Sequence, residues 1–488
     1  MPDQKPAIGT LDEPPLFPPA PPRWRRVGYP AGVLTAATAA GLAGALAVTP
    51  DRPGIGWLLA GIAAVGAVTT VHLRARRAVP DNGEPVPLWR SERLWWTLAT
   101  LALLAVGTFR AAPWLFALCA ITAGVTASLA VLGHRTINGF VFDTLAIPLS
   151  SIDATCWVWV NQDPRRRAGT GNRRLAVSLA ATVTVLLVFV PLLASADATF
   201  AAGIDTITPR IGGDTAFAWA IIFTAIGIGV VSPLYLLAGP PAPAATKPPR
   251  RTFTLLEWAL PVGTLTALFA AFLGTQLVAA FGGDDHVQRT AGLTYAEYAR
   301  SGFWQLSAVT VLTLAVILPV LHRAAKDTPA QRRWLRALLV AVSALTLIID
   351  ASALTRLWTY QEAYGFTVYR LMVGTTELGL AAVYLMVIGA VLRLRFAWLP
   401  RATVATAAAT LLTLAALDPE RLIADRNIDR WQHSGKLDTA YLGSLSADIA
   451  PAIERLPADL RVRLRADLAD QLAGDTWQSW NLARHNAR

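Results

Sequence analysis

Long apolar runs recur along the whole chain, and they limit its possible folds more than any other feature. Each run is about 18–25 residues long, which is the length an α-helix needs to cross about 30 Å of hydrocarbon. Of the 488 residues, 54% are hydrophobic and only 15% are charged. Soluble domains carry about 25% charged residues. The sequence therefore predicts a polytopic α-helical membrane protein and excludes an ordinary soluble enzyme.

The apolar runs predict about eleven spanning helices in an all-α transmembrane bundle. The expected ranges are 28–49, 54–72, 93–109, 111–132, 174–195, 214–238, 253–281, 302–323, 332–355, 367–395 and 401–417. The bundle thus covers 28–417. A Pro-rich tail at 1–27 precedes it, which we expect to be disordered in the cytoplasm. A small α-helical domain at 418–488 follows it.

Lysine and arginine gather in alternate loops, which predicts the orientation. The N-terminal tail and the loops after the even-numbered spans are rich in them, whereas the other loops carry one or two each. The N-terminus is therefore expected in the cytoplasm and the C-terminal domain outside it. The net charge of +11 sits mostly in these loops. We expect a lipid bilayer as partner and no nucleic acid, because no basic helix with interleaved aromatic residues lies outside the membrane.

Two segments, 140–160 and 239–251, interrupt the regular series of spans. The stretch 140–160 is apolar but contains Asp143, Pro148 and Asp153. We interpret it as an in-plane or re-entrant helix on the cytoplasmic side, since irregular backbone at membrane depth must be buried in protein. A Pro-rich linker at 239–251, also cytoplasmic, divides the bundle.

The C-terminal domain shows helical periodicity. Gly435 is expected to end its first helix. Two apolar stripes follow, formed by Leu442, Leu445, Ile449 and Ile453 and by Leu460, Leu464, Leu468 and Leu472. Such helices either bind a protein partner at 418–488 or pack on themselves as a cap.

Four stretches support a family resemblance. They are Gly292–Phe303 (GLTYAEYARSGF), Arg356–Arg370 (RLWTYQEAYGFTVYR) and Asn427–Ser446, together with the shorter Ser195–Phe200. They resemble a family of bacterial multi-pass membrane proteins known only as a domain of unknown function. The resemblance covers roughly 170–455. It implies a bacterial plasma membrane protein but no reaction.

Glu377 is the first candidate site residue, because an ionisable group inside a span is costly. Its helix is expected to begin near Thr367, so that ten residues put Glu377 about 15 Å into the membrane. Arg370, Glu377 and Tyr384 are spaced by seven and share one helix face. Glu377 is either a proton or substrate site or a carboxylate paired with an arginine to fix helix packing.

A second candidate site gathers polar residues at the outer helix ends. Arg300, Arg356 and Arg370 could converge on a phosphate or carboxylate, for which the guanidinium fork suits bidentate contact. The neighbouring candidates are Tyr298, Tyr360, Asp197, Glu297 and Asp350. The alternative is that the three arginines neutralise these carboxylates in an interfacial network.

Motifs of known chemistry are absent from the sequence. It contains no H-E-x-x-H, G-x-S-x-G or G-x-x-x-x-G-K-[ST] pattern, and its six histidines are scattered. We therefore expect no metal and no cofactor.

Three functions remain open. The first is transport or binding of an anionic lipid or envelope precursor. The second is a non-catalytic scaffold or sensor whose C-terminal domain binds a partner. The third is an envelope transferase acting on a lipid-linked substrate, with Asp197 or Glu297 as base. The sequence favours a non-enzymatic role.

Overall fold

The computed structural model describes residues 22–77, 92–132, 140–162, 213–240, 252–281, 303–473 and 475–488. Within these ranges the chain is helical, apart from an isolated parallel bridge between Phe253 and Ala324. The expected span 174–195, most of the tail 1–27 and most of the linker 239–251 lie outside the described residues.

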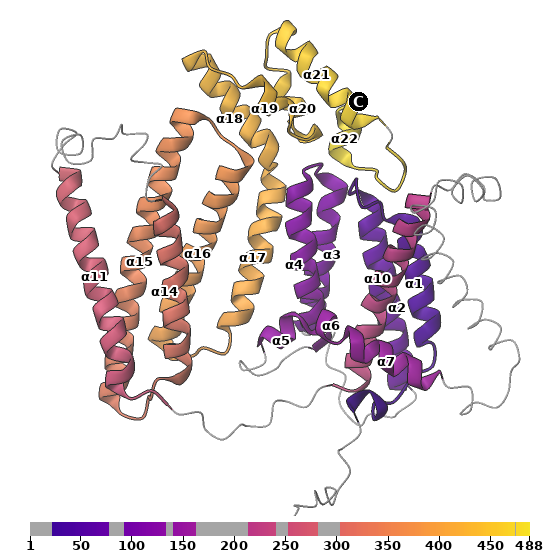
Figure 1. Cartoon of the computed structure of the whole chain (residues 1–488), viewed down its shortest axis with the longest axis horizontal. Coiled ribbons are helices and arrows are strands. Elements are labelled where there is room, and N and C mark those ends of the chain that lie inside the picture. Colours follow the sequence, from indigo (N-terminus) through magenta and orange to yellow (C-terminus); the bar gives the residue numbers. More distant parts are fainter. Residues whose placement is uncertain are drawn as a thin grey trace, which may run out of the picture.

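The bundle consists of two groups of helices (Figure 1). The first contains α1 (Val33–Ala47), α2 (Ile55–Arg77), α3 (Glu92–Phe109), α4 (Pro113–Leu132) and α10 (Gly213–Ala238). The second contains α11 (Leu255–Phe281), α14 (Phe303–Arg323), α15 (Pro329–Tyr364) and α16 (Val368–Arg393). Between them lies α17 (Leu399–Leu417), which packs on α3, α4 and α16.

Eight of the described helices are long and apolar enough to cross a membrane, and α1 is a shorter apolar helix. The prediction of an all-α, multi-pass membrane bundle is confirmed. The helix bounds follow the expected spans closely, because the apolar runs end in charged or Pro- and Gly-rich segments. The number of about eleven spans stays a prediction.

Helix α15 differs most from its expected span of 332–355. It has 36 residues and continues to Tyr364. Leu357 and Gln361 are buried in this extension, so packing rather than hydropathy carries the helix onward. It ends at Gly365, whose φ of 86° few other residues adopt.

The stretch 140–160 forms three short helices, α5 (Phe140–Thr144), α6 (Ala146–Leu149) and α7 (Ser151–Asn161). They lie at the end of the bundle opposite the C-terminal helices (Figure 1). Trp157 of α7 is fully buried, and its ring packs on Tyr29 and on Tyr235 of α10. Its indole N–H donates to the carbonyl of Val27 at 3.1 Å.

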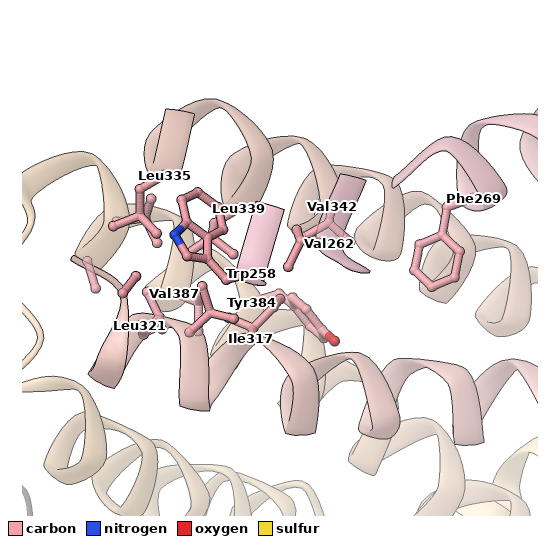
Figure 2. Close-up of a cluster of buried hydrophobic side chains, with 14 of the residues drawn as sticks. Trp258, Val262, Phe269, Ile317, Leu321, Leu335, Leu339, Val342, Tyr384 and Val387 are labelled. Atoms are coloured by element: carbon pink, nitrogen blue, oxygen red, sulfur yellow. The ribbon is translucent and has the colours of Figure 1, made fainter. Parts of the chain in front are cut away.

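The largest apolar core lies in the second group of helices. Trp258 of α11, Ile317 of α14, Leu339 of α15 and Tyr384 of α16 meet there, all at most 1% exposed (Figure 2). This core fixes the spacing of α14, α15 and α16, between which the candidate site lies.

The C-terminal segment forms a cap of helices over one end of the bundle (Figure 1). They are α18 (Pro419–Ser434), α19 (Thr439–Gly443), η5 (Ala447–Ile449), α20 (Ala450–Ile453), α21 (Ala458–Leu472) and α22 (Leu482–Asn486). Gly435 ends α18 with a φ of 67°. The stripe from Leu442 to Ile453 lies on three short helices and packs on Leu464 and Leu468 of α21.

Candidate functional site

Two carboxyl groups meet in the interior of the second group of helices. Glu377 of α16 is 2% exposed and Asp350 of α15 is 1% exposed. The side chains of Asp350 and Glu377 interact with each other. Ser307 of α14 donates a hydrogen bond from Oγ to Oε1 of Glu377. Three helices therefore contribute to one buried acidic site, which we call the acid pair, Asp350 and Glu377.

A polar seam continues from the acid pair along α16. Tyr384, two turns beyond Glu377, donates from its hydroxyl to the carbonyl oxygen of Thr310 at 2.6 Å. Other buried polar side chains of α14 and α15 include Thr310, Thr313, Ser343 and Thr346. Such a polar stripe is expensive in a membrane interior, where hydrogen-bonding groups lack water.

Each carboxyl of the acid pair has one oxygen to which no described residue donates a hydrogen bond. Oδ1 of Asp350, Oε2 of Glu377 and the hydroxyl of Ser343 are buried and have no hydrogen-bond partner among the described residues. Buried polar atoms are usually satisfied, so the two unsatisfied oxygens of the acid pair mark a place where a proton can bind.

The arginines expected near Glu377 have other contacts. Arg370 donates to the carbonyl of Gly365, and its guanidinium stacks over the ring of Tyr360 at 4.4 Å. Arg356 donates to Oε1 of Gln276 of α11 at 3.0 Å. Glu377 is thus contacted by Ser307 and Asp350, whereas Arg370 lies near the end of the same helix.

Only some of the outer-cluster candidates can be placed. Tyr360 packs on Tyr364, with ring centroids 4.8 Å apart. Asp350 was expected near the outer end of its helix but lies beside Glu377, because α15 continues for two more turns beyond Arg356. Asp197, Glu297, Tyr298 and Arg300 lie outside the described residues. The convergence of three arginines, and the bases of a transferase, therefore stay predictions.

The acid pair suits proton binding rather than metal binding. Two carboxylates buried this close together repel each other when both are ionised, so the pair favours holding at least one proton. A metal ion would need more ligands. Among the described residues, no group of three or more His, Cys, Asp or Glu side chains is arranged to hold one.

A second cluster of carboxylates joins the C-terminal helices to the bundle. No pattern in the sequence predicted it. Asp418 accepts from Arg110 at 2.7 Å. Asp448 accepts from the backbone N–H groups of Ala111 and Ala112 at 3.0–3.1 Å, directly before α4. Their signal in the sequence was weak, since each is one acidic residue among many in a polar segment.

Burial raises the pKa values of the carboxyls in this second cluster. It raises the pKa of Asp418 to about 6, with Asp448 raising it further and Arg110 opposing the rise. Burial also raises the pKa of Asp448 and of Glu420, against the hydrogen bonds that each accepts. Glu420 accepts from the indole N–H of Trp114 at 2.8 Å, so it too ties α18 to α4.

The comparison with known families gives one match. A family model described as a domain of unknown function (DUF4153) matches residues 98–456, about three quarters of the chain. The matched range contains the acid pair and the whole second cluster of carboxylates, Asp418, Glu420 and Asp448. No curated protein and no solved structure matches the chain.

Proposed function

The chain belongs to the family described as a domain of unknown function (DUF4153), and we propose that it is a proton-coupled carrier. In this proposal it resides in the bacterial plasma membrane and binds or transports an anionic envelope-related substrate or lipid. The acid pair takes up and releases the coupling proton. The observation that carries the proposal is that Asp350 and Glu377 are buried together, with Ser307 as a hydrogen-bonding neighbour.

The energetic cost of the acid pair supports a functional role. A carboxyl group within a spanning helix costs several kcal/mol unless it is neutral or paired, and such residues mark ion and substrate pathways in membrane proteins. Apolar side chains could pack α14, α15 and α16 at no such cost, as they do in the adjoining core. A site that binds a proton reversibly needs the carboxyls.

The proposed orientation has the N-terminus in the cytoplasm and the C-terminal helices outside. Arginine-rich ends of helices gather at the end opposite the C-terminal helices (Figure 1), and they contain Arg74, Arg76, Arg77, Arg323, Arg332, Arg333, Arg336, Arg393 and Arg395. The connections at the capped end, 48–54 and 110–112, carry Arg52 and Arg110 alone. This asymmetry supports a cytoplasmic arginine-rich end.

Proton flux into vesicles tests the proposal. The full chain is reconstituted into liposomes that contain a pH-sensitive dye, and a potassium diffusion potential drives proton entry. We expect flux above that of protein-free vesicles. Glu377→Gln and Asp350→Asn should each reduce it at least about tenfold, which corresponds to about 1.4 kcal/mol in the barrier. Asp327→Asn, an exposed carboxyl in the loop before α15, is the matched control and should leave the flux unchanged.

A second measurement protects the test against variants that fold poorly. Infrared spectra of the wild-type chain in H2O and in D2O should contain the band of a buried protonated carboxyl, and Glu377→Gln should remove or shift it. Absence of that band, or equal flux in all the variants, would contradict the proposal.

The second candidate function is a scaffold or sensor. Its specific support is the exposed apolar surface of the C-terminal segment, where Val462 is 68% exposed and Trp477 is 60% exposed. A protein partner could cover these side chains. This function predicts no proton flux and no effect of Glu377→Gln beyond stability.

A further inference from the structure

A long apolar groove lies in the first group of helices, away from the acid pair. Its volume is about 640 Å³, and α2, α3, α4 and α10 form its walls. The lining is mostly apolar, with residues such as Ala64, Val68, Ile121 and Val125. This size falls within the usual range of about 300–1,000 Å³ for ligand sites.

A basic cavity adjoins the end of the groove at His72. That cavity measures about 850 Å³ and is lined by His72, Arg74, Arg76 and Arg93, near the start of α1. The two cavities share the lining residues His72, Arg93, Val131 and Leu237, so they adjoin each other. Among the residues that the structure describes, no Asp or Glu lines either cavity.

The groove has the length of an acyl chain. It runs along α2 from Trp57 to His72, which is about 22 Å at a rise of 1.5 Å per residue. One leaflet of a bilayer contributes about 15 Å of hydrocarbon, half of the full core. The groove can therefore hold one extended tail whose polar end lies at His72.

We propose that the groove and the basic cavity form one binding site for an anionic membrane phospholipid. Its acyl chain lies between α2, α3, α4 and α10, and its phosphate is bound by Arg74, Arg76 and Arg93. Guanidinium groups bind phosphate with charge and with paired N–H donors. The site differs from the ordinary lipid contact of a spanning helix because the tail lies among four helices and the head group meets converging cations.

Two glycines let the apolar part be tested separately. Gly124 of α4 and Gly229 of α10 line the groove, and a Cβ atom built on either meets no atom within 4 Å. A leucine at either position would therefore begin in open space and extend into the groove. Gly263 of α11 has the same open surroundings but does not line the groove, so Gly263→Leu is the matched control.

Lipid retention tests the basic part. The full chain is reconstituted with equimolar phosphatidylglycerol and phosphatidylcholine, extracted mildly, and analysed by native mass spectrometry. We expect wild-type protein to retain phosphatidylglycerol with about tenfold preference, equivalent to about 1.4 kcal/mol. The double variant Arg74→Gln/Arg76→Gln should lose this preference. The control Arg333→Gln/Arg336→Gln removes two exposed arginines at the same end of the bundle and should keep it.

The apolar variants complete the test. Gly124→Leu and Gly229→Leu should lose the retained lipid while keeping the thermal stability of the Gly263→Leu control. Equal retention of both lipids by wild-type protein would overturn the anionic site. Unchanged retention in the leucine variants would place the lipid on the outer surface and overturn the groove. Neither result bears on proton flux through the acid pair, so the two proposals fail independently.

Discussion

Buried carboxylates in this molecule are accommodated in two different ways. Asp448 is 2% exposed, yet it accepts hydrogen bonds from the N–H groups of Ala111 and Ala112 and from the hydroxyl of Ser446. It also faces the positive end of the α4 dipole. Asp350 and Glu377 mainly have each other and one hydroxyl. The first arrangement suits a carboxylate that fixes structure, and the second suits a group that exchanges a proton.

Removing the Asp448 carboxylate should loosen the C-terminal helices. Asp448→Ala leaves the N–H groups of Ala111 and Ala112 buried without acceptors, which costs about 1–3 kcal/mol. We expect faster hydrogen exchange in residues 107–112 and in α18, measured by mass spectrometry on the purified full chain. Asp459→Asn, an exposed carboxyl at the start of α21, should behave as the wild type. Equal protection in both variants would mean that this carboxylate does not hold the cap.

The sequence predicted one member of the acid pair better than the other. Glu377 could be located because it lies a countable distance from Thr367, which caps the helix by accepting from the N–H of Arg370. The sequence could not place Asp350 beside Glu377, because which residues of two helices meet depends on how deep each helix lies in the membrane relative to the other. That depth depends on the extra turns of α15, which packing determines and hydropathy does not.

At the scale of elements, the corner between α15 and α16 controls how these two helices meet. Gly365 turns the chain with a φ of 86°, and Asn427 of α18 pairs with the backbone of Phe366. Its Oδ1 accepts from the Phe366 N–H at 2.9 Å and its Nδ2 donates to the Phe366 carbonyl at 2.8 Å. The same corner thus sets the register of the acid pair and anchors the cap.

Gly365→Ala should destabilise this corner. A Cβ atom there would lie 2.8 Å from Oδ1 of Asn427, and the positive φ disfavours any side chain. We expect a loss of about 1–3 kcal/mol, seen as a lower midpoint of thermal unfolding in detergent. Gly379→Ala in α16 meets open space, so it should be neutral or stabilising by up to about 1 kcal/mol. A Gly365→Ala variant as stable as Gly379→Ala would show that the corner is not strained.

Most helix bounds could be predicted because hydropathy alone determines where a chain enters lipid. The apolar runs 214–238 and 401–417 became α10 and α17 with shifts of one or two residues. The interior of the cap could be predicted less well. Its stripe from Leu442 to Ile453 is split by Ser444 and Ser446, whose side chains bond the local backbone and favour turns over one helix.

At the scale of the whole molecule, the C-terminal cap contacts both groups of helices. Asn481 donates to the carbonyls of Gly107 and Arg110 beside α3, and Arg484 donates to the carbonyl of Pro53 before α2. Asn427 reaches the α15–α16 corner in the other group. A movement of one group against the other must therefore strain or release the cap, which makes the docking of the cap a readout of such movement.

The docking of the cap should depend on pH through Asp418. Because the pKa of this carboxyl is raised from 3.8 to about 6, the docked state binds a proton that the unfolded chain releases at the same pH. Folding then takes up protons between about pH 4 and pH 6, so stability falls as the pH rises through this window. From pH 5 to pH 7.5 this one carboxyl should lower the free energy of unfolding by about 1 kcal/mol.

Hydrogen exchange of α18 at pH 5, 6 and 7.5, corrected for intrinsic rates, measures this dependence. Protection should be greatest at pH 5. Asp418→Asn should flatten the profile, because asparagine does not titrate and tolerates the positive φ of 55° at this position. Asp459→Asn should retain the wild-type slope. The pKa values of Asp448 and Glu420 are raised as well, so we expect Asp418→Asn to retain a small slope of the same sign. A slope of opposite sign in the wild type would contradict burial of these three carboxyls as the cause.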